Sequence, residues 1–105
     1  MADVDITYQI KLIESLKCAL LNDISSLFEN MRVPGRENQN ENLASLVTDA
    51  YLLAGRLGLG YESLDEQIIK RLKQKWASDA HNTDINALLM HWAARADVNK
   101  KGGPS

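Results

Sequence analysis

An apolar repeat over residues 5–31 constrains the fold of this chain more than any other feature. Large apolar side chains recur there at alternating steps of three and four residues, the spacing of one helix face. The members of this repeat are Ile6, Ile10, Ile13, Leu20, Ile24, Leu27 and Met31. Four more apolar side chains widen the arc to about half of the circumference, and Lys17 alone interrupts it. We therefore expect a helix about 39 Å long that packs against at least two others and projects toward another subunit.

Pro34 and Gly35 interrupt the helical spacing, so the segment 32–40 is predicted to be a loop. Asn38, three residues before Glu41, has the pattern of an N-terminal cap for a second helix. The apolar stripe of that helix comprises Leu43, Leu46, Val47, Ala50, Leu53, Ala54 and Leu57. Gly58 is expected to end the helix, because glycine tolerates the left-handed backbone conformation found at such ends.

Two further helices are predicted in the C-terminal half. A capping box starts at Ser63 and includes Glu66, which predicts the beginning of a third helix at Ser63. Its apolar residues are Leu64, Ile68, Ile69, Leu72 and Trp76. Asn82 or Thr83 can cap a fourth helix, whose apolar residues are Ile85, Leu88, Leu89, Trp92 and Ala96.

No stretch of the sequence alternates apolar and polar residues over the length of a strand, so the predicted fold class is all-α. The 105 residues suit one domain and are too few for two with separate cores. We therefore expect a single domain over residues 1–98 and a flexible C-terminal tail over residues 99–105. The expected architecture is a four-helix bundle with a long first helix.

Charge and composition exclude several classes of protein. Twelve basic against fourteen acidic residues leave a net charge of -2, which gives no general attraction to nucleic acid or to an anionic membrane. No apolar run approaches the roughly 20 residues of a membrane span, and residues 1–5 carry acids where a signal peptide would be basic. Cys18 is the only cysteine, so one chain can form neither an internal disulfide nor a cysteine zinc site. We expect a cytoplasmic location.

Two stretches of this sequence resemble a known family. They are the segment 10–17 with its continuation to Phe28, and the segment 50–58, Ala-Tyr-Leu-Leu-Ala-Gly-Arg-Leu-Gly, with Tyr61 and the acids after it. Together they resemble the small MazG-like family of bacteria and their phages, a branch of the all-α nucleotide pyrophosphohydrolases. The resemblance covers about residues 6–76. It implies a helical bundle that assembles as a dimer or higher oligomer, with neighbouring subunits completing each core.

The resemblance also implies a magnesium site, but the sequence departs from its pattern. Enzymes of that superfamily carry Glu-x-x-Glu on one helix and Glu-x-x-Asp on the next, because residues three apart share a face and a hard cation needs convergent oxygens. Aligning Arg56-Leu57-Gly58 places Asn42 and Ser45 where the second motif should stand. Neither side chain offers a carboxylate. The lone Glu-x-x-Asp, from Glu62, falls at a helix start, where acids are expected in any case.

Four other acids could still form a metal site. Glu14 and Asp23 are nine residues apart, about 13 Å along a helix, and Glu41 and Asp49 are eight apart, about 12 Å. Neither pair can share one ion within its own helix. Carboxylates from different helices can assemble a metal site in a bundle, so the four could meet across two helices or two subunits. They are the candidate magnesium ligands if the chain is an enzyme.

Other signals of chemistry favour structural roles. The two histidines lack the i,i+3 or i,i+4 partner of a helical zinc site, and Cys18 has no neighbouring base. The sequence contains neither a Gly-x-Ser-x-Gly elbow nor a Gly-rich phosphate loop. A basic stretch at residues 70–75 is better explained as a solvated helix face than as a nucleic-acid site. Lys17 is expected either to lay its stem along the core or to pair with an acid of another helix.

The sequence therefore favours a non-catalytic or catalytically degenerate MazG-like module, with no catalytic or cofactor-binding residue assigned. It is expected to form a homodimer or higher oligomer through its first two helices and to bind a protein partner or a small ligand such as a nucleotide. One alternative is a divergent magnesium-dependent nucleoside triphosphate pyrophosphohydrolase. Another is a nucleic-acid-binding accessory protein, although nucleic acid is the less expected partner. No metal or other cofactor is expected unless the enzyme alternative holds.

Overall fold

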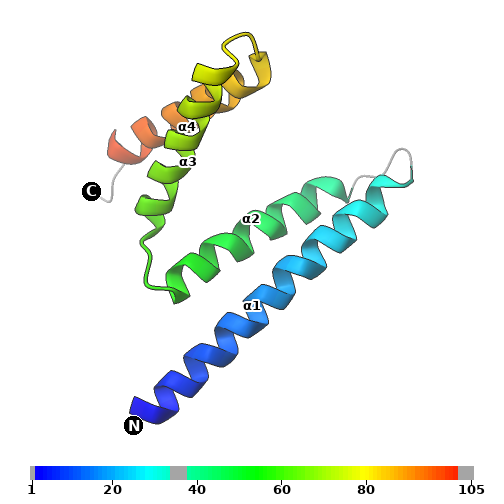
Figure 1. Ribbon diagram of the computed structural model, residues 1–105, viewed down its shortest axis with the longest axis vertical. Helices are drawn as coiled ribbons and strands as arrows, with labels where there is room; N and C mark the ends of the chain where they lie inside the picture. The colour runs from blue at the N-terminus through cyan, green and yellow to red at the C-terminus, as the bar shows by residue number, and fades with distance from the viewer. Residues whose placement is uncertain (1, 34–37, 102–105) are drawn as a thin grey trace. The chain divides into compact units, whose positions relative to one another are not determined.

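A computed structural model describes residues 2–33 and 38–101, and these residues form four helices and no strand. The helices are α1 (Ala2–Met31), α2 (Gln39–Arg56), α3 (Tyr61–Ser78) and α4 (Thr83–Lys101) (Figure 1). The all-α prediction is confirmed. The chain divides into two compact units, Met1–Tyr61 and Glu62–Ser105, and each is described by itself. Residues 34–37 of the predicted loop and 102–105 of the predicted tail lie outside the described residues.

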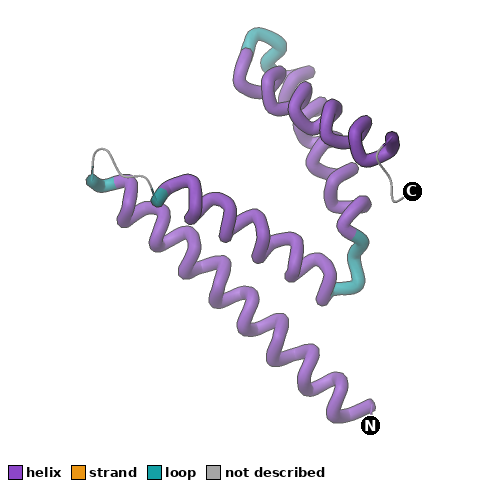
Figure 2. The backbone as a smooth tube through the Cα atoms, turned by 180° about the vertical axis from the view of Figure 1, so that it is seen from behind, coloured by secondary structure: helices purple, strands orange, loops and turns teal. Residues whose placement is uncertain are grey.

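The first unit is an antiparallel hairpin of α1 and α2, which lie side by side in both ribbon views (Figures 1 and 2). Polar bonds join the two helices at well-separated levels. Asn30 Nδ2 donates to Asn42 Oδ1 at 2.6 Å near the loop, and Arg56 donates to Gln9 Oε1 at 3.4 Å toward the other end. Leu16 and Leu46 are half-buried on the two helices. The contact between the helices is therefore partly polar, and much of the apolar surface stays outside it.

The ends of α2 show which sequence signals act as predicted. Gly58 has a φ of +83° and follows the last turn, and Leu59 N–H donates to the Ala54 carbonyl at 2.9 Å, so the predicted glycine stop is confirmed. At the other end α2 begins at Gln39, directly after Asn38. The Asn38 side chain makes no capping hydrogen bond. Asn38 is therefore the N-cap residue, as predicted, but its side chain does not make the capping hydrogen bond on which the prediction was based.

The start of α3 differs from the prediction by two residues. The helix begins at Tyr61, so Ser63 lies inside the first turn and does not cap it. A tertiary contact accounts for the difference. The Tyr61 ring lies against α2, with its centroid 6.3 Å from that of Tyr51 and so close to Gly55 that an added Cβ would stand 3.1 Å from the Tyr61 hydroxyl. Packing of the Tyr61 ring against α2 therefore makes Tyr61 the first residue of α3, whereas the local capping pattern predicted Ser63.

The second unit contains α3 and α4. Leu72 of α3 is its buried residue, and Trp76, Ile85, Leu89 and Trp92 are half-buried. Asn82 Oδ1 accepts hydrogen bonds from the N–H groups of Asp84 and Ile85 at 3.0 and 3.2 Å, which confirms Asn82 as the cap of α4. The backbone of α4 is helical as far as Lys101. The division into a domain over residues 1–98 and a tail from residue 99 stays a prediction.

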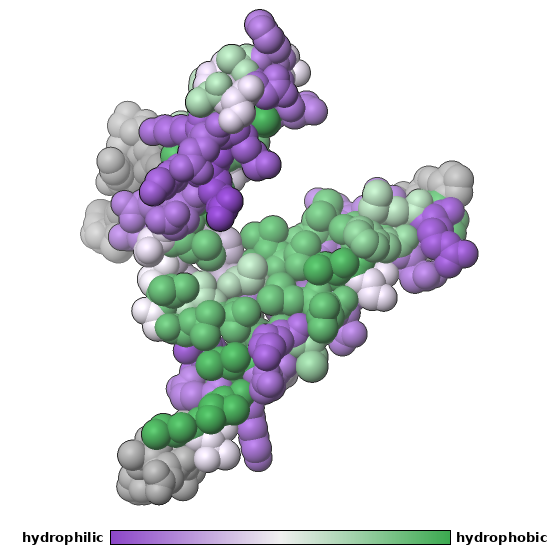
Figure 3. Space-filling view, viewed as in Figure 1, coloured by the Kyte–Doolittle hydropathy of each residue, from purple (hydrophilic) through white to green (hydrophobic). Residues whose placement is uncertain are grey.

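Burial in the described residues is low for a folded chain. Ala54 and Leu72 alone are buried, at 6% and 7% exposure, and no side chain there is fully buried. Six large apolar side chains form what we call the apolar face of the hairpin and are 38% to 68% exposed: Ile10, Leu21, Ile24 and Phe28 of α1 with Leu43 and Val47 of α2. Figure 3 shows hydrophobic surface running across both helices on one side. Large contiguous apolar patches usually mark association surfaces.

Candidate carboxylate site between α1 and α2

Asp23 of α1 and Asp49 of α2 come together between the two helices of the hairpin. Ser45 Oγ, one turn before Asp49 on α2, donates a hydrogen bond to Asp23 Oδ1 at 2.8 Å. Asp23 Oδ2 is inaccessible to solvent and accepts no hydrogen bond from the described residues while both carboxyls are ionised. Two acids and one hydroxyl therefore form a small polar cluster in which one carboxylate oxygen lacks a donor.

The surroundings of Asp49 favour its protonated form. A hydrogen bond with Asp23, partial burial of the carboxyl and the negative charge of Asp23 raise the pKa of Asp49 above its ordinary value of 3.8. A proton on Asp49 supplies Asp23 with a donor and removes the repulsion between two neighbouring negative charges. The two side chains thus form a pair in which a proton on Asp49 is favoured.

This pair predicts that the hairpin becomes more stable as the pH falls toward the ordinary carboxyl range. Because the folded-state pKa of Asp49 is raised above 3.8, the folded chain binds this proton more tightly than the unfolded chain. The associated stability is fully present below the unfolded pKa and is lost as the pH rises through the folded pKa. We expect Asp49→Asn, which supplies an amide donor at every pH, to weaken this dependence and to raise the urea midpoint near neutral pH.

Urea titrations followed by circular dichroism at about pH 4 and about pH 7 measure this effect. Glu41→Gln is the matched control, since it removes one negative charge from an exposed position of the same helix. An unchanged pH dependence in Asp49→Asn, or an equal change in Glu41→Gln, would show that the acid pair does not couple to folding.

The other two candidate ligands lie apart from this pair. Glu14 forms a 2.7 Å ion pair with Lys17, one turn along α1, and both side chains are well exposed. Glu41 is exposed in the first turn of α2. In residues 2–33 and 38–101, no three His, Cys, Asp or Glu side chains are close enough to hold a metal ion. The structure thus brings Asp23 and Asp49 together, while the four-carboxylate site across two subunits stays a prediction.

The environment of the Lys17 side chain differs from both environments that the sequence led us to expect. Its stem is not laid along the core, since the side chain is 59% exposed, and its ammonium pairs with Glu14 of its own helix. A hydrogen bond from this pair and the neighbouring negative charge raise the pKa of Lys17. The physical reason for this pairing is local: the Lys17 side chain is 59% exposed, and Glu14, three positions earlier, lies on the same face of α1.

Sequence reasoning assigned no role to Ser45 or Asn42 beyond the absence of a carboxylate. In the structure both are hydrogen-bonded across the hairpin, Ser45 to Asp23 and Asn42 to Asn30. A signal was present, since Asn42, Ser45 and Asp49 recur at steps of three and four and so share one helix face. Polar residues at this spacing predict a polar helix contact once the partner helix is known.

A comparison with family models identifies the family of this chain. The model of the MazG-like family matches residues 6–87, from α1 into the first turns of α4. The chain belongs to the MazG-like family. No curated protein and no solved structure matched it. The chain is thus a helical module related to the nucleotide pyrophosphohydrolases.

Membership of this family raises the question whether the MazG-like chain can hold magnesium. Mg²⁺ is commonly held in proteins by one or two carboxylates together with substrate phosphates and water. Asp23 and Asp49 are two such carboxylates on facing helices, and the buried Asp23 oxygen lacks a donor. These residues fit a weakly held ion that needs phosphate to complete its coordination. Ser45 and Asn42 offer only neutral oxygens, so the site carries less negative charge to attract the ion than it would with carboxylates at these two positions.

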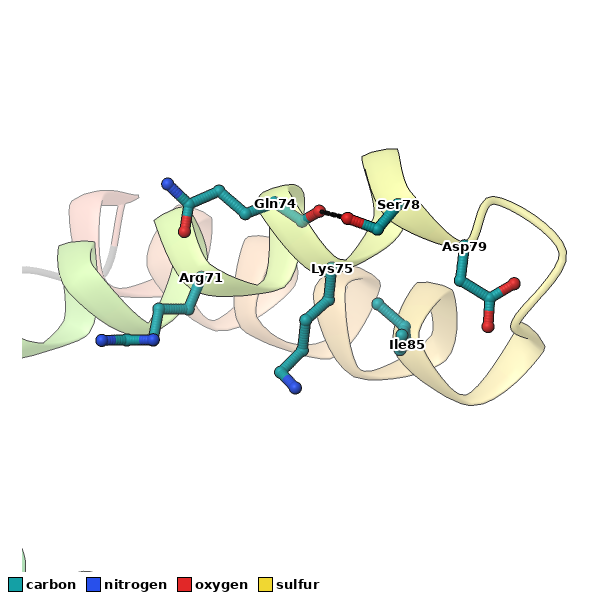
Figure 4. A pocket seen from close by; sticks show the side chains of 6 residues that line it. All are labelled: Arg71, Gln74, Lys75, Ser78, Asp79 and Ile85. Atoms are coloured by element: carbon teal, nitrogen blue, oxygen red, sulfur yellow. Dashed lines mark hydrogen bonds between the residues drawn. The ribbon is translucent and has the colours of Figure 1, made fainter.

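The remaining candidate residues show no assembled chemistry. Cys18, His81 and His91 are all exposed. In the second unit, a shallow hollow of about 390 Å³ lies beside α3 and the start of α4, where Ser78 Oγ donates to the Gln74 carbonyl at 3.1 Å (Figure 4). Its lining residues are Arg71, Gln74, Lys75, Ser78, Asp79 and Ile85. Within the described part of the chain, no helix has the length and apolar character that crossing a membrane would require.

Proposed function

We propose that this MazG-like chain is a non-catalytic or catalytically degenerate helical module that acts through association of its helix faces. The observation that carries the proposal is the apolar face of the hairpin, whose six side chains remain 38% to 68% exposed in a chain with two buried residues among those described. Burying apolar surface stabilises a complex by about 25 cal/mol per Å². A chain with so small a core of its own gains most of its stability from a partner that covers this face.

A second copy of the chain is the partner that we propose for the apolar face. Two-fold dimers are the commonest soluble assemblies, and their interface pairs one surface patch with itself. An apolar patch on two neighbouring helices is self-complementary in this sense, because it needs no opposite charge on the other side. Light scattering coupled to gel filtration tests the dimer: we expect about twice the 11.7 kDa of one chain, whereas a mass of one chain would overturn it.

The acid pair supports a second candidate function. Asp23 and Asp49 are the two of the four proposed magnesium ligands that meet, as a divergent magnesium-dependent pyrophosphohydrolase would require. In such an enzyme Asp23 and Asp49 would hold the ion, which would supply charge neutralisation for the nucleotide phosphates. Ser45 would keep Asp23 oriented through its hydrogen bond. Glu14 and Glu41 would join the site only across a subunit interface.

Assays with a panel of nucleoside triphosphates and either Mg²⁺ or Mn²⁺ separate the two functions. For a non-catalytic module we expect no pyrophosphate release above that of a matched sample of the Asp23→Asn, Asp49→Asn double variant. Release that this double variant abolishes, while Glu62→Gln at an exposed position of α3 leaves it intact, would establish the enzyme and refute the non-catalytic proposal. The same samples should be checked by circular dichroism for unchanged helix content.

A further inference from the structure

One row of side chains along α1 repeats every seven residues and is exposed along its whole length. Successive members lie alternately four and three residues apart, which is the spacing of the contact line in a coiled coil. We call it the heptad row of α1, and its members are Ile10, Glu14, Lys17, Leu21, Ile24, Phe28 and Met31. All seven are exposed. The row contains the α1 part of the apolar face, so a partner that covers this face also covers the row.

The charged pair of Glu14 and Lys17 interrupts the heptad row one turn after Ile10 and one turn before Leu21. Its two atoms are 2.7 Å apart, and 59% of each side chain is exposed. An exposed ion pair within one helix contributes little to stability. A polar residue in the contact line of a coiled coil, by contrast, fixes the register of the two helices at a cost in stability. The place of this pair therefore points to a role in association.

The apolar members of the row are placed symmetrically about the charged pair. Ile10 lies four residues before Glu14, and Leu21 lies four residues after Lys17, so both stand about 8 Å along the axis from the midpoint of the pair. A second α1 turned end over end about this midpoint sets Ile10 against the partner subunit's Leu21. It also sets Glu14 against the partner subunit's Lys17, and symmetry repeats both contacts. No member of the row lies on the axis, so no like charges meet there.

We propose that the α1 helices of two copies pack antiparallel along their heptad rows, with Glu14 paired with the partner subunit's Lys17 across a two-fold axis at this midpoint. The inference rests on the proposed dimer and deepens it, because it names the two residues that fix the direction and the register of the dimer. Each Lys17 ammonium keeps Glu14 of its own helix and gains a second acid from the partner.

Other arrangements of the two rows leave these charges without an opposite charge across the contact. In a parallel pair in register, Glu14 faces the partner subunit's Glu14, and Lys17 faces the partner subunit's Lys17. An antiparallel pair shifted by seven residues sets Lys17 against the partner subunit's Leu21 and Glu14 against the partner subunit's Ile24. Both charges are then removed from water opposite apolar side chains, which costs more than exposed charges do. Charge complementarity therefore favours the antiparallel register centred on the pair.

A mixture of two charge variants tests the pairing between copies. Lys17→Glu puts two acids in the row and Glu14→Lys puts two bases there, so like charges meet when either variant pairs with itself. Neither variant keeps the ion pair within its own helix. By light scattering over a series of concentrations, we expect each variant alone to associate at least about tenfold more weakly than the original chain. The equimolar mixture should recover dimers to within about threefold of the original, because acids then face bases.

Glu29→Lys and Arg32→Glu are the matched control variants. Glu29 and Arg32 form an exposed ion pair of the same i,i+3 spacing, about 20 Å or more along the chain axis from the proposed two-fold axis. The two substitutions make the same charge changes, so their mixture carries the same net charges as the test mixture. We expect both control variants to remain dimeric when alone. Circular dichroism of all four variants should show unchanged helix content.

Disulfide formation measures the register directly, because two cysteines can join only when their Cα atoms lie within about 7 Å. Cys18→Ser first removes the native thiol. In that background we expect Ile10→Cys mixed with Leu21→Cys to form the mixed disulfide at least about tenfold faster than either variant forms a disulfide with itself. The two copies of residue 10 would stand about 16 Å apart along the axis in the proposed register.

Several results would contradict this register while leaving the proposed dimer intact. They are unchanged association of both single charge variants, a mixture no stronger than its components, control variants with equal effects, and faster disulfide formation of Ile10→Cys with itself. In each case the original chain would still have the mass of a dimer. An original chain with the mass of a single copy would instead refute the dimer and this inference together.

Discussion

Phe28→Glu is expected to abolish the proposed dimer and leave a single chain of 11.7 kDa at micromolar concentration. Phe28 is 62% exposed on the apolar face, so glutamate at this position meets solvent in the isolated chain and apolar surface in the dimer. Burying a phenylalanine contributes about 1.5–3 kcal/mol, and a two-fold dimer contains the substitution twice. The association constant should therefore fall at least about 100-fold. Light scattering over a series of protein concentrations measures it.

Ser26→Glu is the control for this prediction. Ser26 is exposed on the same helix, two residues and hence about 200° around the axis from Phe28, so glutamate there adds the same charge away from the apolar face. We expect the Ser26→Glu mass to equal that of the original chain. Equal dissociation by both substitutions would point to net charge, and a stable dimer in Phe28→Glu would show that the apolar face is not the interface.

Leu72→Ala is expected to produce the largest loss of stability of any single truncation in the second unit. Leu72 is 7% exposed and is the buried residue of that unit among those described. Removing a buried leucine side chain costs about 3 kcal/mol through lost burial and the cavity left behind. Both tryptophans of the chain, Trp76 and Trp92, lie in this unit, so the urea dependence of tryptophan fluorescence reports its unfolding.

Leu88→Ala makes the same chemical change at a position of α4 that is 45% exposed. Its expected cost is below about 1 kcal/mol, because most of its apolar surface already meets water. Similar losses in the two variants would mean that a partner covers Leu88 in solution. Circular dichroism recorded beside the fluorescence distinguishes unfolding of this unit from unfolding of the α1–α2 hairpin, which contains no tryptophan.

The acid pair links the stability of the hairpin to the question of catalysis. Asp23 and Asp49 repel each other when both are ionised, and a proton or a cation relieves that repulsion. The Ser45 hydrogen bond satisfies one Asp23 oxygen without supplying positive charge. In the enzyme alternative that we propose, these two carboxylates, with polar neutral side chains beside them, would hold a cation only weakly.

Local sequence signals determined the helices of this protein. The three-and-four spacing of apolar residues predicted α1, and the stop at Gly58 was located correctly. Asn82 was one of the two residues predicted to cap α4. These features depend on backbone conformation and on neighbours within one turn, so the nearby sequence contains the necessary information. The resemblance that suggested the MazG-like family depended on the same short segments, and the family match confirms it.

The partners of the polar side chains were decided only by the tertiary structure. Asp23 and Asp49 are 26 positions apart, and no residue near either one indicates that they meet. Glu14 and Glu41 were equally good candidate ligands in the sequence, but they lie away from this pair in the structure. Tyr61 likewise starts α3 before the capping box because its ring packs on α2. Which side chains meet across two helices depends on the register and rotation of one helix against the other. Those quantities are set by the whole contact and not by any segment alone.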